Sequence, residues 1–307
     1  MGVHLSTAPE PLVDDTVADS GRVATPLAPT DRVLLAYVAL VSVVAMLRAP
    51  TQPGCRWLLV AHALILTLVW LVRRPGLGVV GRALREAYPL LLLPGLYAAL
   101  DVLNGAGQVV AHDELVQRWE LALFGGQPSR AWWRAAPSPF WSTVFHGAYF
   151  AYYLIVPLPV AYFALRGELA AVRRTVFAVV ATFVVCYLWF VFFPVAGPYY
   201  AFPRPDQAVL DNPMARLVYA TLATGSSYGA AFPSSHVAAT VACAAAAWMG
   251  SRRLGLALVV PTALLALGVV YCQMHYAVDA AAGLVVAAVV LWTTRLLERR
   301  GGAFAGD

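Results

Sequence analysis

Two short segments hold most of the reactive side chains of an otherwise apolar chain. They are FPSSH at residues 232–236 and HYAVD at residues 275–279, whose histidines lie 39 residues apart. On a helix, four residues at about 100° each bring Asp279 to within roughly 40° of His275. The carboxylate can then accept a hydrogen bond from one ring nitrogen and leave the other free. This arrangement orients and activates a nucleophile or a base.

The first segment supplies a second histidine at the start of another apolar run. If the two helices pack together, His236 becomes a second proton-handling group. Pro233 suits the first position of a helix, where Ser234 and Ser235 offer hydroxyls and backbone N–H groups. A helix N-terminus attracts anions. Two histidines, one carboxylate and an anion-binding helix start together indicate phosphoryl transfer.

Other interpretations of these residues stay open. A histidine inside a membrane can serve packing or hydrogen bonding alone. Two histidines and one aspartate are also a plausible set of metal ligands, although the sequence has no His-Glu-x-x-His motif and no cysteine pair at zinc spacing. The four cysteines suggest neither a disulfide framework nor a zinc site and are interpreted as small packing residues. We therefore expect no metal and no other cofactor.

Both of these segments resemble motifs of a known family. PSSH at 233–236 resembles the Pro-Ser-Gly-His motif of the type 2 phosphatidic acid phosphatase superfamily, and His275-x-x-x-Asp279 resembles its final His-Asp motif. The resemblance implies a helical membrane core, metal-independent catalysis and a phosphohistidine intermediate. It also implies that His275 is the nucleophile, Asp279 its orienting partner and His236 the acid that protonates the leaving group.

Further segments resemble the branch of that superfamily that includes inositol phosphorylceramide synthases. These segments are ELALFGGQP at 120–128 and FPVAGPYY at 193–200. Arg204-Pro205 resembles the end of the superfamily's first motif, whose lysine position is Gly197 here. Arg204 is the expected phosphate holder through bidentate contacts, and Arg216 is the alternative.

The third motif of the superfamily starts with Ser-Arg, and these positions are Gly268 and Val269 here. The missing arginine favours the synthase-like branch over a simple phosphatase. Four residues are candidates for a headgroup pocket, although structural and interfacial roles are open alternatives. They are His146, Tyr199, Tyr200 and Tyr271.

The composition places these segments in a membrane. The chain of 307 residues is 61% hydrophobic and only 12% charged, which is far from the average of soluble proteins. Several uncharged runs are long enough to span a bilayer. We expect an all-α polytopic protein with about eight transmembrane helices and a six-helix phosphatase-type core. The expected spans are 33–47, 57–72, 88–103, 140–165, 175–195, 233–249, 254–273 and 276–292.

The expected organisation has four parts. Residues 1–30 form a disordered cytoplasmic tail, and residues 31–103 form N-terminal transmembrane helices. Residues 104–295 form the membrane-embedded catalytic core with outward-facing loops, and residues 296–307 form a second cytoplasmic tail. The start of the chain lacks the basic residues and apolar stretch of a signal peptide.

The arginines indicate an orientation. All 21 basic residues are arginine. With eight spans, 14 of them fall on the side that holds both chain ends and seven on the other, which marks the first side as cytoplasmic. Arg204, the start of the sixth span and the junction of the last two spans then all face outward. This distribution also accounts for the net charge of +5, so nucleic acid is not needed as a partner.

The function expected from these observations is that of a lipid phosphatase or phosphotransferase in a bacterial plasma membrane, with its site on the extracytoplasmic side. Its partners are a phospholipid substrate and either water or a lipid or polyol alcohol as acceptor. Transfer of a phosphate-containing headgroup to an alcohol is the first interpretation. A phosphatase acting on phosphatidic acid or polyprenyl diphosphate, a metal-dependent membrane hydrolase and a non-catalytic lipid-binding or transport protein are the alternatives.

Overall fold

The computed structural model describes residues 26–74, 78–107 and 109–304, so most of the tail expected at residues 1–30 lies outside the described residues. The α-helices are α1 (Pro29–Arg48), α2 (Gly54–Val72), α3 (Val79–Leu103), α4 (Asp113–Phe124), α5 (Pro128–Ala135), α6 (Pro139–Phe150), α7 (Tyr152–Ile155), α8 (Pro157–Leu165), α9 (Leu169–Phe192), α10 (Pro198–Ala201), α11 (Gln207–Leu210), α12 (Pro213–Gly225), α13 (Ser235–Gly250), α14 (Arg252–Tyr271) and α15 (Ala277–Gly301). A short 3-10 helix, η1, covers Gly105–Gly107.

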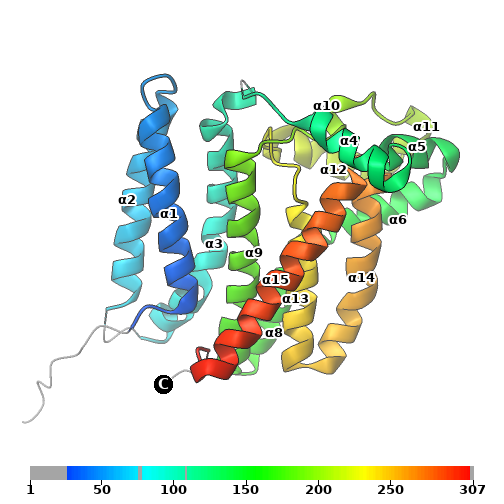
Figure 1. Cartoon of the computed structure of the whole chain (residues 1–307). Coiled ribbons are helices and arrows are strands. Elements are labelled where there is room, and N and C mark those ends of the chain that lie inside the picture. Colours follow the sequence, from blue (N-terminus) through cyan, green and yellow to red (C-terminus); the bar gives the residue numbers. More distant parts are fainter. Residues whose placement is uncertain (1–25, 75–77, 108, 305–307) are drawn as a thin grey trace, which may run out of the picture.

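The fold is all-α and polytopic, as predicted. Seven helical segments in the described part of the chain are long and apolar enough to cross a membrane, and α13 is an eighth apolar helix of 16 residues. Each of the eight expected spans has a counterpart among these segments. Figure 1 shows the long helices side by side, with α4, α5, α10, α11 and α12 gathered at one end and the C-terminus at the other.

Helix α13 packs against α9, α14 and α15 and lies at the centre of this group of helices. It begins after Ser234, whose side chain accepts a hydrogen bond from Val237 N–H. Much of its buried surface is alanine, as at Ala238, Ala239 and Ala242, which are all fully buried. Small side chains allow helices to approach closely in a membrane, so this composition brings the start of α13 near the neighbouring helices.

The fourth span differs from the single helix expected over 140–165. The chain forms three successive helices, α6, α7 and α8, with breaks at Ala151 and Val156. The second break precedes Pro157, which lacks a backbone N–H and so interrupts the helical hydrogen bonding. Tyr152 directly follows the first break, and its ring lies 4.6 Å from that of His236 at the start of α13.

Two boundaries also differ from the expected ones. Helix α3 begins at Val79 rather than near Tyr88, and α15 continues to Gly301, through the first part of the segment expected to be a tail. Beyond the end of α15, Phe304 is buried and its ring lies 5.4 Å from that of Phe177. The final residues are therefore packed against α9 up to Phe304.

Candidate active site

His236 stands in the first turn of α13, surrounded by aromatic rings. The ring centroids of Tyr149 and Tyr152 lie 4.7 and 4.6 Å from its imidazole, and that of His275 lies 5.7 Å away. Its Nδ1 is buried and has no hydrogen-bond partner among the described residues. The structure thus brings together the two histidines expected to act in phosphoryl transfer, although 39 residues separate them in the chain.

His275 lies in the loop between α14 and α15 and is 4% exposed. Its Nδ1 is 3.0 Å from the carbonyl oxygen of Ala231, so Nδ1–H donates to that carbonyl and Nε2 keeps its lone pair. Nε2 has no hydrogen-bond partner in the described part of the chain, which leaves it available to attack. Burial lowers the pKa of His275 to about 4, and the hydrogen bond to Ala231 opposes this shift.

The contact between His275 and Asp279 is different from the one expected. Asp279 Oδ2 lies 3.5 Å from His275 Nδ1, but the hydrogen bond of that nitrogen goes to Ala231. Asp279 Oδ2 instead accepts from Tyr276 N–H at 2.8 Å and caps the start of α15. The expectation assumed that both residues lie on one helix, whereas His275 precedes the first helical residue, Ala277.

Ser234 and Ser235, both expected to hold phosphate, have different roles in the structure. Ser234 is fully buried: its N–H donates to the carbonyl of Asp279 at 2.9 Å, and its Oγ accepts from Val237 N–H. A Cβ at Gly283 would lie 2.6 Å from the Ser234 carbonyl oxygen, so α13 and α15 touch at this point. Ser234 therefore joins two helices, and Ser235 is the serine that lines a cavity.

Two carboxylates of α4 hold the loops around the histidines, and sequence reasoning missed both. Asp113 accepts from the N–H groups of Ala196 and Gly197, each at 2.8 Å, and from Tyr276 OH at 2.9 Å. Glu120 is fully buried and accepts from the N–H groups that open α15. We expected an interfacial segment here. The available signal was a pair of acidic residues seven positions apart, and therefore on the same face of a helix, in a chain with few acids.

Replacing Glu120 with alanine should destabilise the protein. The N–H groups of Ala277 and Val278 donate to its carboxylate at 3.1 and 2.9 Å, and the substitution leaves both without this acceptor. Loss of a buried acceptor costs about 1–3 kcal/mol. We expect a lower thermal unfolding midpoint in detergent and reduced turnover. Glu114→Ala, which changes an exposed acid in the same helix, is the control, and equal midpoints for the two variants would contradict this role.

Gln273 is a third positioning residue that the sequence did not reveal. It adopts a φ of 60°, in the left-handed region that residues other than glycine rarely occupy. Its Nε2 donates to the carbonyls of Pro198 and Pro203 at 3.2 and 3.0 Å, and its Oε1 accepts from Trp133 Nε1–H at 3.0 Å. Gln273 thus fixes the loop of His275 against the segment that leads to Arg204.

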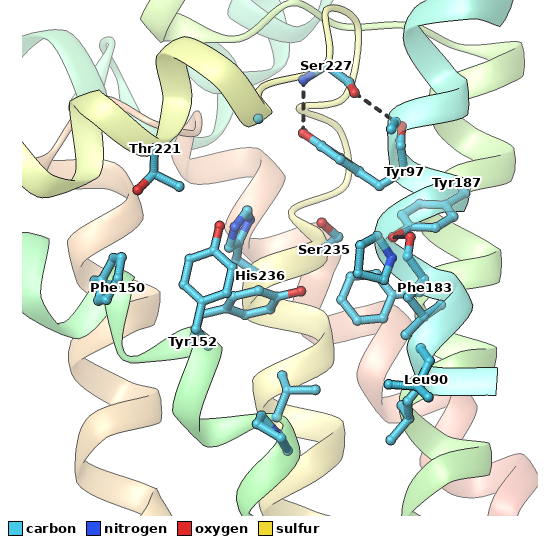
Figure 2. A pocket seen from close by; sticks show the side chains of 18 of the residues that line it. Leu90, Tyr97, Phe150, Tyr152, Phe183, Tyr187, Thr221, Ser227, Ser235 and His236 are labelled. Atoms are coloured by element: carbon cyan, nitrogen blue, oxygen red, sulfur yellow. Dashed lines mark hydrogen bonds between the residues drawn. The ribbon is translucent and has the colours of Figure 1, made fainter. Parts of the chain in front are cut away.

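A cavity of about 680 Å³ opens beside His236. Its walls come from α3, α6 to α9, α12 and the start of α13, and His275 is not among the residues that line it. Figure 2 shows Tyr152 and Ser235 close to His236, Ser227 and Tyr97 above them, and Leu90 toward the opposite end. The lining of the cavity is mainly apolar, with a smaller polar end at Tyr97 and Ser227 beyond His236, which suits a lipid with a polar headgroup.

Neither arginine expected to hold phosphate lines this cavity. Arg204 is exposed; its Nη2 donates to Tyr199 OH at 3.0 Å, and its guanidinium lies 5.0 Å from the Tyr199 ring centroid. Arg216 is exposed and pairs with Asp211 at 2.8 Å. Both lie at the same end of the molecule as the histidine pair (Figure 1), and the structure places neither beside the cavity.

The four residues expected in a headgroup pocket also lie outside this cavity. Tyr271 OH donates to the Ala136 carbonyl, and His146 Nδ1 contacts the carbonyl and hydroxyl oxygens of Ser142. Tyr199 contacts Arg204, and Tyr200 OH lies 2.9 Å from Ser226 Oγ. Their local hydrogen bonds explain these placements. The polar residues that do line the cavity include Tyr97, Asp101, Tyr149, Tyr152, Thr221 and Ser227.

A three-residue metal-ligand set is not formed at this site. Among residues 26–74, 78–107 and 109–304, no group of three histidine, cysteine, aspartate or glutamate side chains is arranged to hold a metal ion. His275 Nδ1 bonds to the Ala231 carbonyl and Asp279 Oδ2 to Tyr276 N–H, while His275 Nε2 and His236 Nδ1 have no hydrogen-bond partner among the described residues.

Comparison with known proteins agrees with this geometry. No curated protein and no solved structure matches the chain. Residues 115–293 match the profile of the PAP2 superfamily, and this stretch covers more than half of the chain and contains His236, His275 and Asp279. The membership supports a phosphatase-type activity on a phosphorylated lipid in a membrane. With its paired histidines at the mouth of a membrane helix bundle, the chain belongs to the PAP2 superfamily.

Proposed function

We propose that this protein transfers a phosphate-containing headgroup from a phospholipid to an alcohol through a phosphohistidine intermediate. The observation that carries the proposal is the pair of imidazole rings 5.7 Å apart, of which His236 lines a mainly apolar cavity of about 680 Å³ that has a polar end. The rings are close enough for one bound phosphate to contact both. The resemblance of the 120–128 and 193–200 segments to the inositol phosphorylceramide synthase-like branch favours transfer over hydrolysis.

The chemistry needs two steps. His275 Nε2 attacks phosphorus, the bond from phosphorus to the lipid alcohol breaks, and His236 gives that alcohol a proton. The headgroup phosphate is then bound to His275. His236 takes the proton of the acceptor alcohol, whose oxygen attacks phosphorus and releases His275. Water as acceptor would give hydrolysis by the same route.

Two protein features support the nucleophilic role of His275. The Ala231 carbonyl accepts its Nδ1–H and stabilises positive charge on the ring as Nε2 bonds to phosphorus. The carboxylate of Asp279, 3.5 Å away, adds to this stabilisation. Asp279 thus keeps the orienting role that the resemblance implies, acting together with a backbone carbonyl.

The phosphate charge also needs a partner. Ser235 lines the cavity at the N-terminal turn of α13, where the helix dipole and unpaired N–H groups favour an anion. Arg204 remains our proposed cationic contact, with Arg216 as the alternative, on the strength of the first-motif resemblance. We further propose that this end faces the extracytoplasmic side of a bacterial plasma membrane, since the arginine excess lies at the opposite end.

One assay tests the proposed function. Purified protein in EDTA receives phosphorus-labelled phosphatidic acid or phosphatidylinositol, with and without a lipid alcohol, and all labelled products are separated. Label that moves to a new lipid only when the alcohol is present supports transfer, and label that appears as free phosphate from phosphatidic acid, or as inositol phosphate from phosphatidylinositol, supports hydrolysis. Activity that disappears in EDTA and returns with a divalent ion would contradict the metal-independent route.

The pH dependence of turnover should have its acidic limb below pH 6.5. Burial lowers the pKa of His275 from 6.5 to about 4. The imidazole therefore stays neutral and nucleophilic down to that pH, and it loses its nucleophilicity only when it gains a proton below that pH. The measurement is kcat/KM from roughly pH 3 to 9. An acidic limb above 6.5, or a flat profile, would contradict this assignment.

A further inference from the structure

One wall of the cavity comes from a helix outside the part of the chain that matches the PAP2 superfamily. That part begins at residue 115, whereas α3 covers Val79–Leu103. Helix α3 contributes an apolar strip that includes Leu90 and Leu93, followed by Tyr97 and Asp101 closer to its C-terminal end. Helix α3 thus contacts whatever occupies the cavity along both its apolar part and its polar end.

The polar residues of this wall meet the loop that precedes α13. Tyr97 OH accepts from Ser227 N–H at 3.3 Å, and Ser227 Oγ donates to the Tyr97 carbonyl at 3.1 Å. Asp101 Oδ1 accepts from Tyr228 N–H at 3.0 Å. Figure 2 shows the bonded pair Tyr97 and Ser227 at the top of the cavity, above His236. These bonds hold the side chains in place while the second carboxylate oxygen of Asp101 bonds to no described residue.

The negative charge of Asp101 excludes phosphate from the end of the cavity that Tyr97, Asp101 and Ser227 line, which we call the subsite. Asp101 forms no ion pair among the described residues, and no arginine of the described chain lines the cavity. Asp101 also lies in the last turn of α3, where the helix dipole adds negative potential. A carboxylate in such a place repels a phosphate and attracts hydrogen-bond donors or a cation. The phosphate belongs beside His236, and the group beside Asp101 must be a donor.

We propose that Tyr97, Asp101 and Ser227 bind the hydrogen-bond-donating end of a phosphodiester headgroup, a hydroxyl or an ammonium group. The lipid tail then lies along Leu90 and Leu93, the phosphate beside His236, and the far end of the headgroup at Asp101. The substrate is accordingly a phosphodiester lipid rather than a phosphomonoester such as phosphatidic acid, which has nothing to place in this subsite. This assignment rests on the proposed function, because it takes the occupant of the cavity to be the lipid donor.

The test measures binding without turnover, so that it does not depend on the reaction. The protein carries His275→Ala and is incubated with phosphatidylethanolamine, phosphatidylinositol or phosphatidic acid of equal chain length, and retained lipid is measured by native mass spectrometry. Asp101→Asn keeps an oxygen for Tyr228 N–H and removes the charge. The matched control is Asp206→Asn, the same change in an exposed aspartate that does not line the cavity.

We expect the His275→Ala protein to retain at least one of the two phosphodiester lipids better than phosphatidic acid. Asp101→Asn should weaken that retention roughly tenfold or more, as for loss of a charged hydrogen bond, and change phosphatidic acid less than twofold. A loss confined to phosphatidylethanolamine identifies an ammonium ligand, and one confined to phosphatidylinositol identifies hydroxyls. Equal retention of all three lipids, no effect of Asp101→Asn, or an equal loss for phosphatidic acid overturns the subsite. Turnover of the unmutated protein tests the proposed function separately.

Discussion

Replacing His275 with alanine should reduce kcat by about 10⁴-fold or more, because it removes the atom that bonds to phosphorus. His275 Nε2 is the unpaired nitrogen of a ring whose other nitrogen is held by the Ala231 carbonyl at 3.0 Å. His236 is the only other histidine near it in the described chain, and in the proposed mechanism it handles the proton. The variant should fold, since alanine leaves the main-chain bond from His275 N–H to the Val269 carbonyl intact.

The measurement combines turnover with trapping of the covalent intermediate. Quenched wild-type enzyme should carry label from phosphorus-labelled lipid in an acid-labile, base-stable form, as expected of phosphohistidine, and the His275→Ala protein should carry none. His62→Ala is the matched control, because His62 is a buried histidine of α2 that bonds to Ser42 and does not line the cavity. Activity of His275→Ala within tenfold of wild type, or label still bound to the variant, would reject His275 as the nucleophile.

The membrane fold was predictable because span length and lack of charge are local properties. Every expected span has a helix, including the short α13, whose start was predicted at Pro233 and observed at Ser235. The errors have two sources. The break between α7 and α8 falls just before Pro157, a local signal that the sequence contains. Helix α3 extends back to Val79 through a charged stretch that local hydropathy does not assign to a span.

The site was predictable only where chemistry and spacing coincide in a short motif. The pairing of His236 and His275 followed from two motifs at the same end of neighbouring helices. The bond from Nδ1 of His275 to the Ala231 carbonyl did not, because main-chain partners leave no pattern in side-chain types. The capping role of Asp279 was misjudged for a related reason: spacing of four residues indicates one helix face only if both residues are helical, and α15 starts after His275.

The supporting residues and the cavity lie beyond what a sequence pattern shows. Glu120 bonds to Val278, 158 residues later, and Asp101 bonds to Tyr228, 127 residues later. The spacing of Asp113 and Glu120 places both on one face of a helix, but it does not show which other helix will cover that face. The same applies to Arg204, which the first-motif resemblance singled out and which the structure places on the surface against Tyr199.

Replacing His236 with alanine should lower kcat by about 10²–10⁴-fold, the usual contribution of general acid and base catalysis. The imidazole is held between Tyr149 and Tyr152 and faces His275, so it lies where the leaving alcohol separates from phosphorus. An alcohol leaves poorly as an alkoxide, and its departure requires a proton. A nitrophenolate leaves readily without one. The variant should therefore lose far more activity toward a lipid alcohol ester than toward a nitrophenyl ester of the same phosphate.

This difference separates proton transfer from damage to the fold. Truncation of the ring also removes contacts with the two tyrosines, and that loss would lower the rates with both leaving groups by the same factor. We expect the ratio of the two rates to change by about 10²-fold or more, because only one reaction uses the proton. Equal losses with both esters would assign His236 a packing role, and unchanged turnover would remove it from the mechanism. A ratio that changes as expected, together with the absence of label on His275→Ala, would assign the nucleophilic attack to His275 and the proton transfer to His236.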